Sequence, residues 1–218
     1  MKKTTVKMCG FQTSEDVKKA IPLSPDYMGF ILVPGRTRTV SHTTLQNLLQ
    51  HVPDKSKRIA VMQNPSFQDV AALMHAVQID GIQLHGNESV LFCREIKNHF
   101  DLQLIKVFHI EEGKPVPLVK EYLPWIDVIL LDYANKNKRG GQGVSFDWRQ
   151  IVEVKNQLPS ATLPVWVAGG LHRGNVGALI DQYAPDGIDL SSGIETNGKK
   201  DSMKMRQLID EVSRVDEK

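Results

Sequence analysis

Apolar and polar positions alternate in blocks along the whole chain. Eight short runs are rich in apolar and β-branched residues, as expected of strands that are buried on both faces. These runs cover residues 5–8, 27–33, 58–62, 80–85, 102–107, 128–131, 163–168 and 187–190. Several of them are closed by a glycine or a proline, such as Pro34, Gly86 and Gly169. The pattern therefore predicts about eight strands, each ended by a turn.

The segments between these runs have helical spacing. Thr13 and Ser14 precede Glu15 and Asp16, which predicts a helix start with acidic residues in its first turn. Further helices are predicted after Ser41, over residues 66–77, 88–100, 175–183 and 203–215, and from an entry at residues 146–148. The segment 111–123 contains a glycine and two prolines, so any helix in it should be short or late.

Strands that alternate with helices favour parallel βα units. Eight such units close into a (β/α)₈ barrel of the α/β class, and a chain of 218 residues has the length of one such domain. We therefore predict a single TIM barrel domain over residues 1–218. A doubly wound open sheet is the alternative, but the GxGxxG expected after its first strand is absent from the sequence.

The composition restricts the class of protein. Hydrophobic residues make up 41% and charged residues 24%, which is ordinary for a globular protein, and no apolar run approaches a membrane span. The basic start MKKTT lacks the apolar stretch of a signal peptide, so we expect a cytoplasmic protein. A net charge of +2 does not indicate nucleic acid as a partner, and we expect neither nucleic acid nor membrane binding. The sequence leaves open whether the chain is a monomer or a homodimer.

The carboxyl ends of the strands meet at one mouth in a barrel, and catalytic groups gather there. The residues at these positions are chemically unlike: Cys9, Arg36, Arg38, Gln83, His85, Lys106, Asp132, Gly169, Gly170, Ser192 and Gly193. The glycines of the last two loops, together with Gly141 in the glycine-rich loop after the sixth run, predict a phosphate site made of backbone amides. A phosphorylated small molecule is the expected substrate.

Proton transfer is the chemistry that these groups favour. The two cysteines form neither a disulfide framework nor a metal site, and we predict no metal. Cys9 and Asp132 should face each other across the mouth, one as a thiolate base and the other as a carboxylic acid. A thiolate at neutral pH requires a lowered pKa of Cys9, and an acid requires a raised pKa of Asp132 through partial burial. The alternatives are a buried structural thiol and a capping carboxylate.

Three further residues have competing interpretations. His85 is expected to be a packed, hydrogen-bonded residue that shapes the mouth. Lys106 could form a Schiff base, as in an aldolase, but this reading leaves Cys9 and Asp132 without a role. Cys93 lies among helical apolar residues and is predicted to be part of the core.

Six motifs, in order, resemble the phosphoribosylanthranilate isomerases of tryptophan biosynthesis. They are VKMCG (6–10), GFILVPGRTRTVS (29–41), GIQLHGNE (81–88), LLDYANKNKRGGQGVSFDW (130–148), VAGGL (167–171) and IDLSSGIETNGKKD (188–201). The resemblance covers nearly the whole chain and implies a TIM barrel. It also implies an Amadori rearrangement, in which phosphoribosylanthranilate becomes the 1-deoxyribulose 5-phosphate ketose.

The resemblance also implies roles for single residues. Cys9 would remove the proton from C2 of the sugar, and Asp132 would protonate the furanose ring oxygen. The family's carboxylate-binding arginine aligns best with Arg38, although Arg36 is a second candidate. The phosphate site maps to the amides around Gly141, Gly169, Gly170, Ser192 and Gly193. No cofactor is implied, because the reaction is an internal proton transfer.

Some positions depart from the family pattern. Gln142 stands where the family has a small residue. The third strand ends in Met62, Gln63 and Asn64, where the family usually has a phenylalanine- or valine-asparagine pair. A barrel that binds a sugar phosphate without catalysis is one alternative. A related sugar-phosphate isomerase of histidine biosynthesis is another, but it would carry an aspartate in place of Cys9. The loop after the sixth strand could be a lid over the ligand.

Overall fold

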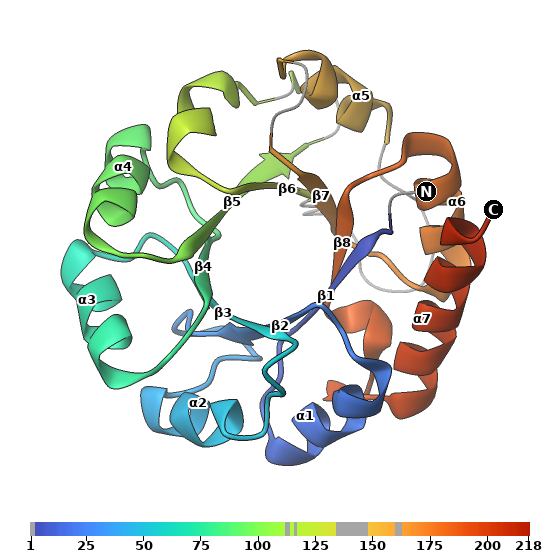
Figure 1. The fold of residues 1–218 in the computed structure, drawn as a ribbon, viewed down its shortest axis with the longest axis horizontal. Helices are drawn as coiled ribbons and strands as arrows, with labels where there is room; N and C mark the ends of the chain where they lie inside the picture. Colours follow the sequence, from blue (N-terminus) through green and yellow to red (C-terminus); the bar gives the residue numbers. More distant parts are fainter. Residues whose placement is uncertain (1–2, 112–113, 116, 134–147, 160–162) are drawn as a thin grey trace.

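The computed structural model describes residues 3–111, 114–115, 117–133, 148–159 and 163–218. Eight parallel strands close into a barrel in sequence order, and helices surround it (Figure 1). The strands are β1 (Thr5–Cys9), β2 (Tyr27–Ile31), β3 (Lys57–Met62), β4 (Gly81–Leu84), β5 (Gln103–Ile110), β6 (Val128–Tyr133), β7 (Val165–Ala168) and β8 (Gly187–Leu190). Pairing of β8 with β1 closes the ring, so the predicted barrel is confirmed and the open sheet is excluded.

The outer layer consists mainly of α-helices. They are α1 (Ser14–Ala20), α2 (His42–Leu49), α3 (Phe67–Ala76), α4 (Val90–His99), α5 (Arg149–Asn156), α6 (Arg173–Tyr183) and α7 (Ser202–Asp216). Short 3₁₀ helices are η1 (Ile21–Leu23), η2 (Lys120–Trp125) and η3 (Ser192–Ile194). Between β5 and β6 the described residues contain only η2, as the prolines of that segment predict. No helix in the described part of the chain is long and apolar enough to cross a membrane.

Hydroxyl side chains determine where several helices begin. Ser41, Ser66 and Ser89 each precede a helix, and the hydroxyl of each accepts the backbone N–H three residues further on. Thr13 does the same for α1. Each hydroxyl satisfies one of the amides that the first turn of a helix leaves without a partner. The helix starts predicted at Thr13, Ser41 and Ser66 are therefore confirmed.

Side chains alternate between the two faces of each strand, and this alternation produces two hydrophobic cores. One lies between the barrel and the helices, and the other fills the barrel itself. The inner core consists of Tyr27, Ile59, Ile105, Val107, Val128, Leu130, Trp166 and Ala168. Because successive residues of a strand point to opposite faces, the residues two positions beyond this inner core, such as Asp132 after Leu130, also point inward. The sequence period thus decides which side chains reach the mouth.

Four aspartates fasten the N-terminal end of the barrel, and we call them the aspartate clamps. Each directly precedes an even-numbered strand and contacts one residue of the strand before it. The carboxylate accepts that residue's N–H and the aspartate N–H donates to its carbonyl, in the pairs Asp26–Val6, Asp80–Arg58, Asp127–Leu104 and Asp186–Val165. The carboxylate contacts measure 2.7–2.8 Å. The same device therefore joins the strands in pairs.

A small hairpin follows the last barrel strand. Its strands β9 (Glu195–Thr196) and β10 (Lys199–Lys200) pair antiparallel around Asn197 and Gly198, which both have positive φ. Two central residues with positive φ make the tight turn that Asn-Gly sequences favour. The pairing places Glu195 directly opposite Lys200.

Candidate active site

Two adjoining cavities open at the C-terminal end of the barrel. One, of about 260 Å³, is lined by Cys9, Gln83, His85, Asp132 and by the loops after β7 and β8. The other, of about 410 Å³, is lined on one side by the segment after β2, which contains Arg36 and Arg38, and on the other by His85, His109 and Asp132. Arg38, His85 and Asp132 line both cavities. The structure therefore brings together most of the residues predicted for the mouth.

Cys9 lies next to a buried ion pair inside the barrel. The ammonium of Lys7, two residues earlier on β1, contacts both carboxylate oxygens of Asp189 at 2.9 Å, and its positive charge lowers the pKa of the Cys9 thiol. Gly29 on the neighbouring strand makes room for this arrangement. A Cβ on Gly29 would lie 2.7 Å from Cys9 Sγ and 3.0 Å from Lys7 Nζ. A side chain at this position would therefore displace the Cys9 thiol or the Lys7 ammonium.

The electrostatics of Cys9 differ from the predicted ones. Burial raises the pKa of the Cys9 thiol, and this effect outweighs the Lys7 cation, which lowers it. The side chain is only 5% exposed, so the charged form loses most of its hydration. The free protein therefore holds Cys9 as a thiol at neutral pH, and not as the ready thiolate that the sequence led us to expect. The nearby cations are the groups able to stabilise a thiolate once it forms.

Asp132 belongs to a chain of polar side chains across the mouth. Its carboxylate Oδ2 lies 3.3 Å from His85 Nε2, and His85 Nδ1 lies 3.2 Å from Gln83 Nε2. The carboxyl group is partly buried, with 20% of its side chain exposed. His109, which is paired in register with Asp132, packs edge to face against His85 with ring centroids 5.2 Å apart. His85 is hydrogen-bonded and packed, as the sequence predicts, and it orients the carboxylate.

Arg38 is held by an ion-pair network from the hairpin. Its guanidinium contacts Glu195 through Nε at 2.8 Å and through Nη2 at 2.6 Å, and Lys200 contacts the same carboxylate at 2.6 Å. Burial alone would raise the pKa of Glu195, but the hydrogen bonds from Arg38 and Lys200 outweigh it and lower that pKa. Arg36 is exposed and reaches Gln63 at 3.4 Å. The structure thus fixes one of the two candidate arginines and leaves the other at the surface.

Lys106 lies on the other face of its strand. Its neighbours Ile105 and Val107 belong to the inner core, so Lys106 points outward from the barrel. There it forms a buried ion pair with Glu88 at 2.8 Å and donates to the carbonyl of Gly86. It does not line either of the two cavities that contain Asp132. This placement removes the geometric basis of the aldolase interpretation.

The loops after β7 and β8 touch each other beside Cys9. Gly169, Gly170 and Ser192 line the 260 Å³ cavity. Gly193 lies so close to the preceding loop that a Cβ there would be 1.9 Å from the carbonyl oxygen of Leu171. Only glycine allows the two backbones to approach this closely. Gly141 and Gln142, with the predicted lid, lie outside the described residues.

Two buried polar atoms of the 260 Å³ cavity have no partner among the described residues. They are Oε1 of Gln83 and Oγ of Ser191. A buried acceptor or hydroxyl without a partner costs free energy, so such atoms commonly contact a ligand or water. These two atoms mark the wall of the cavity as a binding surface.

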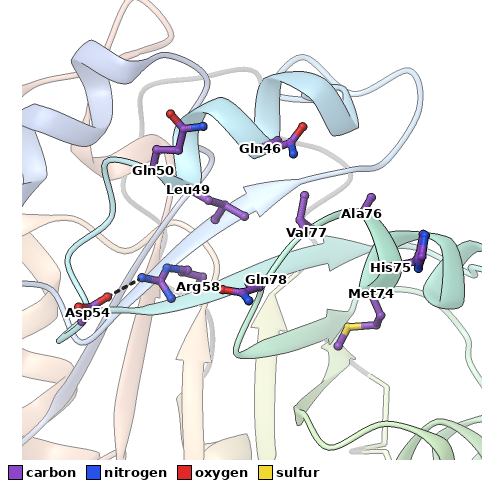
Figure 2. Close-up of a pocket in the computed structure, with 10 residues that line it drawn as sticks. All are labelled: Gln46, Leu49, Gln50, Asp54, Arg58, Met74, His75, Ala76, Val77 and Gln78. Atoms are coloured by element: carbon purple, nitrogen blue, oxygen red, sulfur yellow. Dashed lines mark hydrogen bonds and ion pairs between the residues drawn. The ribbon is translucent and has the colours of Figure 1, made fainter.

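A different hollow lies at the opposite end of the barrel, between α2 and α3. It measures about 580 Å³ and is lined by Leu49, Met74 and the Arg58–Asp54 ion pair (Figure 2). None of the predicted site residues lines it. The C-terminal cavities are therefore the candidate active site.

Sequence reasoning missed several residues that build this site. Glu195 and Lys200 could have been found from the Asn197-Gly198 hairpin signal between them. Lys7 and Asp189 could have been found from the strand period, because they point inward one step below Cys9 and Ser191. His109 was missed because the fifth strand was predicted to end at Val107, whereas it continues to Ile110.

Known proteins resemble this chain over most of its length. A family model described as N-(5'phosphoribosyl)anthranilate (PRA) isomerase matches residues 6–211. The N-(5'-phosphoribosyl)anthranilate isomerase of Crocosphaera subtropica is 34% identical over 96% of this chain and 99% of its own length.

Solved structures agree with this result. A phosphoribosyl anthranilate isomerase in complex with reduced 1-(o-carboxyphenylamino)-1-deoxyribulose 5-phosphate is 25% identical, with a TM-score of 0.78, over 97% of this chain and 99% of the other. A structure of monomers of the dimeric enzyme from Thermotoga maritima has the same identity, TM-score and coverage.

Proposed function

The chain belongs to the N-(5'-phosphoribosyl)anthranilate isomerase family, and on that premise we propose that Cys9 and Asp132 are its catalytic pair. The reaction converts N-(5'-phosphoribosyl)anthranilate into 1-(o-carboxyphenylamino)-1-deoxyribulose 5-phosphate. The observation that supports the pair is that Cys9 and Asp132 line one cavity at the C-terminal end of the barrel. No other thiol among the described residues lines that cavity.

The proposed mechanism consists of two proton transfers. Asp132 gives its proton to the furanose ring oxygen, and the ring opens to a Schiff base. Cys9, which is a thiol in the free protein, releases its proton to solvent, and the thiolate then takes the proton from C2 of the sugar. The resulting enolamine tautomerises to the amino ketose. Lys7 supports the second step, because its positive charge lowers the pKa of Cys9 and so favours the thiolate. His85 supports the first step by holding the carboxylate of Asp132.

Substrate binding is assigned to the groups around this pair. The amides near Gly169, Gly170, Ser192 and Gly193 would bind the phosphate, together with Gly141 outside the described residues. Gln83 offers the unpartnered Oε1 as an acceptor for a sugar hydroxyl. We expect a monomer or a homodimer, which sedimentation would decide, and the cytoplasmic location stays a prediction from the sequence.

Arg38 is our choice for the anthranilate carboxylate. Glu195 takes Nε and Nη2, which leaves the Nη1 donors for a ligand. Arg38→Met should raise KM more than Arg36→Met does, because an arginine fixed by a partner loses less conformational entropy on binding. Steady-state kinetics of both variants test the choice, and a larger KM effect for Arg36→Met would reverse it.

The decisive experiment measures turnover of freshly generated phosphoribosylanthranilate by loss of anthranilate fluorescence. Cys9→Ser and Asp132→Asn should each lower kcat by about 10² or more, as expected for a lost proton-transfer group. Matched controls are Cys93→Ala, which removes the core thiol, and Asp127→Asn, at the opposite end of the strand that carries Asp132. Both controls should keep kcat near the wild-type value.

Two outcomes would contradict the proposal. If Cys9→Ser and Asp132→Asn turn over substrate like the wild type, the catalytic pair is wrong. If the wild-type protein is inert yet binds the product, the chain is a sugar-phosphate-binding barrel without catalysis.

A further inference from the structure

Three potential metal ligands meet at the mouth, each on or directly after a different strand. They are His85 directly after β4, His109 on β5 and Asp132 on β6, and one ligand atom of each lies within 4.8 Å of the others. We propose that these three residues form a binding site for a divalent transition metal ion of the zinc type. The sequence did not reveal it, because 23 residues lie between His85 and His109 and 22 between His109 and Asp132, which is far from the short spacing typical of zinc motifs.

The donor set suits zinc. Two imidazole nitrogens and one carboxylate oxygen, with a fourth position open to water or a ligand, are the ligands of many zinc sites. Magnesium and calcium prefer oxygen ligands, so they should bind poorly here. The ligands also border the 410 Å³ cavity, and His85 and Asp132 are 31% and 20% exposed, so an ion can enter from solvent.

The distances require only a small adjustment. His85 Nε2 and Asp132 Oδ2 are 3.3 Å apart. Two ligands that lie about 2.0–2.1 Å from a tetrahedral zinc ion are separated by about 3.4 Å, so this pair already has the required spacing. His109 is in register with Asp132 on the neighbouring strand, and both side chains therefore point to the same face. The ligand atoms already lie within 4.8 Å of one another, so small shifts of the three side chains would complete the site.

The surroundings leave the ring nitrogens available. His109 Nε2 lies 3.2 Å from the carbonyl oxygen of His85, and Nδ1 is buried with no partner among the described residues. One nitrogen can thus be fixed by the carbonyl while the ring keeps a lone pair for a metal. Gln83 contacts His85 Nδ1, and a flip of its amide would present the unpartnered Oε1 to that nitrogen. That contact would leave Nε2 of His85 free to bind the ion.

Nearby positive charge does not oppose the ion strongly. Arg38 borders the same cavity, but its charge is balanced by Glu195. Arg36 is exposed to solvent, where screening weakens its repulsion. The local charge balance therefore depends on the carboxylate of Asp132, which attracts a cation.

An ion at this site would occupy Asp132. A metal-bound carboxylate cannot carry the proton that the isomerisation needs, so binding should inhibit turnover in competition with substrate. This inhibition rests on the proposed role of Asp132, whereas the binding itself does not. An experiment can therefore refute the inhibition without refuting the metal site.

Cobalt(II) serves as a spectroscopic probe of binding in the intact chain. We expect wild-type protein to develop the visible absorption bands of tetrahedral cobalt, and Zn²⁺ but not Mg²⁺ to remove them. His109→Gln should weaken cobalt binding by at least the 10- to 100-fold that loss of an outer-shell partner costs. The matched control is His75→Gln on α3, which should titrate like the wild type. Asp132→Asn gives a second ligand deletion if His109→Gln does not fold by far-ultraviolet circular dichroism.

Several results would overturn the site. They are an absence of visible bands at millimolar cobalt, equal affinities in wild type and both ligand variants, or an intense near-ultraviolet thiolate band, which would assign the ion to Cys9.

Inhibition by Zn²⁺ is measured separately as a ratio to each protein's own metal-free rate. His109→Gln should need at least tenfold more Zn²⁺ than the wild type for half inhibition. If cobalt binds as expected but Zn²⁺ does not inhibit, the site stands and the role of Asp132 as the acid fails.

Discussion

At the N-terminal end of the barrel four aspartates hold four strand pairs in the same way, whereas at the C-terminal end almost every strand finishes in a different side chain. The aspartate clamps each satisfy one N–H and one carbonyl of a strand start. The C-terminal end carries a thiol, an amide, imidazoles, a carboxylate and glycines. A repeated backbone contact stabilises a fold without selecting a ligand. Chemically different side chains at one end can instead select a ligand. In barrels of this kind the N-terminal end generally serves stability and the C-terminal end carries the active site.

The largest change in stability should come from breaking a single ion pair at the C-terminal end, between Glu88 and Lys106. Glu88→Gln leaves the ammonium of Lys106 buried without its counter-charge, since both side chains are 3% exposed or less. An uncompensated buried charge should lower the free energy of unfolding by about 3–5 kcal/mol. Urea denaturation measures this change.

The double variant Glu88→Gln with Lys106→Met is the control for this experiment. It removes the charge but keeps an acceptor for the amides of Asn64 and Gly86, which Glu88 binds in the wild type. It should recover most of the lost stability. If it is as unstable as Glu88→Gln alone, the charge is not the cause.

The aspartate clamps should give a smaller and more uniform effect. Asp26→Ala removes a charged acceptor from the Val6 N–H and should lower the free energy of unfolding by about 1.5–3 kcal/mol. Asp80→Ala should cost less, because Asp80 is exposed and water replaces it more easily. Neither variant should change kcat. Loss of activity in the folded proteins would show that the two ends are not independent.

Alkylation of the two cysteines compares the mouth with the outer core. Cys9 lines a cavity, whereas Cys93 is fully buried on α4, and burial raises the pKa of Cys93 to about 11. Iodoacetamide should therefore modify Cys9 first.

The pH dependence of this reaction tests the raised pKa of Cys9. Because only the thiolate reacts, the rate should rise about tenfold per pH unit from pH 7 and continue past the ordinary thiol value of about 8.5. The stability should change in the opposite direction. A folded protein that keeps a proton which the unfolded chain releases becomes less stable as the pH rises above that ordinary value. A rate plateau below pH 8 would contradict the raised pKa.

The smallest effect is expected at the surface of the N-terminal end. Asp54 pairs with Arg58 at 2.9 Å across the edge of the hollow in Figure 2, but its side chain is fully exposed. Exposed pairs are weakened by water and salt. Asp54→Ala should therefore show no resolvable change in urea midpoint or in kcat. A clear loss of stability would mean that the hollow contributes to the fold.

The features that could be predicted from the sequence are those that short segments of the chain determine. The order of strands, the helix starts after Ser41 and Ser66 and the inward position of Asp132 follow from local spacing, and the structure contains them. The aspartate of each clamp can also be recognised in the sequence, because it directly precedes an apolar run. Its function becomes clear only from the strand pairing in the structure.

Other properties depend on residues far apart in the chain. Arg38 is fixed by Glu195, 157 residues away, and Lys7 by Asp189, 182 residues away. The raised pKa of Cys9 follows from burial, which exists only after the barrel closes. Local patterns contain no information on such contacts, so the pairing of Arg38 and the protonation of Cys9 could not be predicted.

The aspartate clamps also suggest the order in which the barrel forms. Each clamp joins residues only 20–23 positions apart, whereas the contact between Thr4 and Asp216 spans 212 positions. Closing a short loop costs less entropy than closing a long one, and near contacts form sooner during folding. Each pair of strands can therefore assemble as a unit before the ring is complete. The Lys7–Asp189 pair beneath Cys9 joins β1 to β8, so the support of the thiol should be among the last parts of the protein to form.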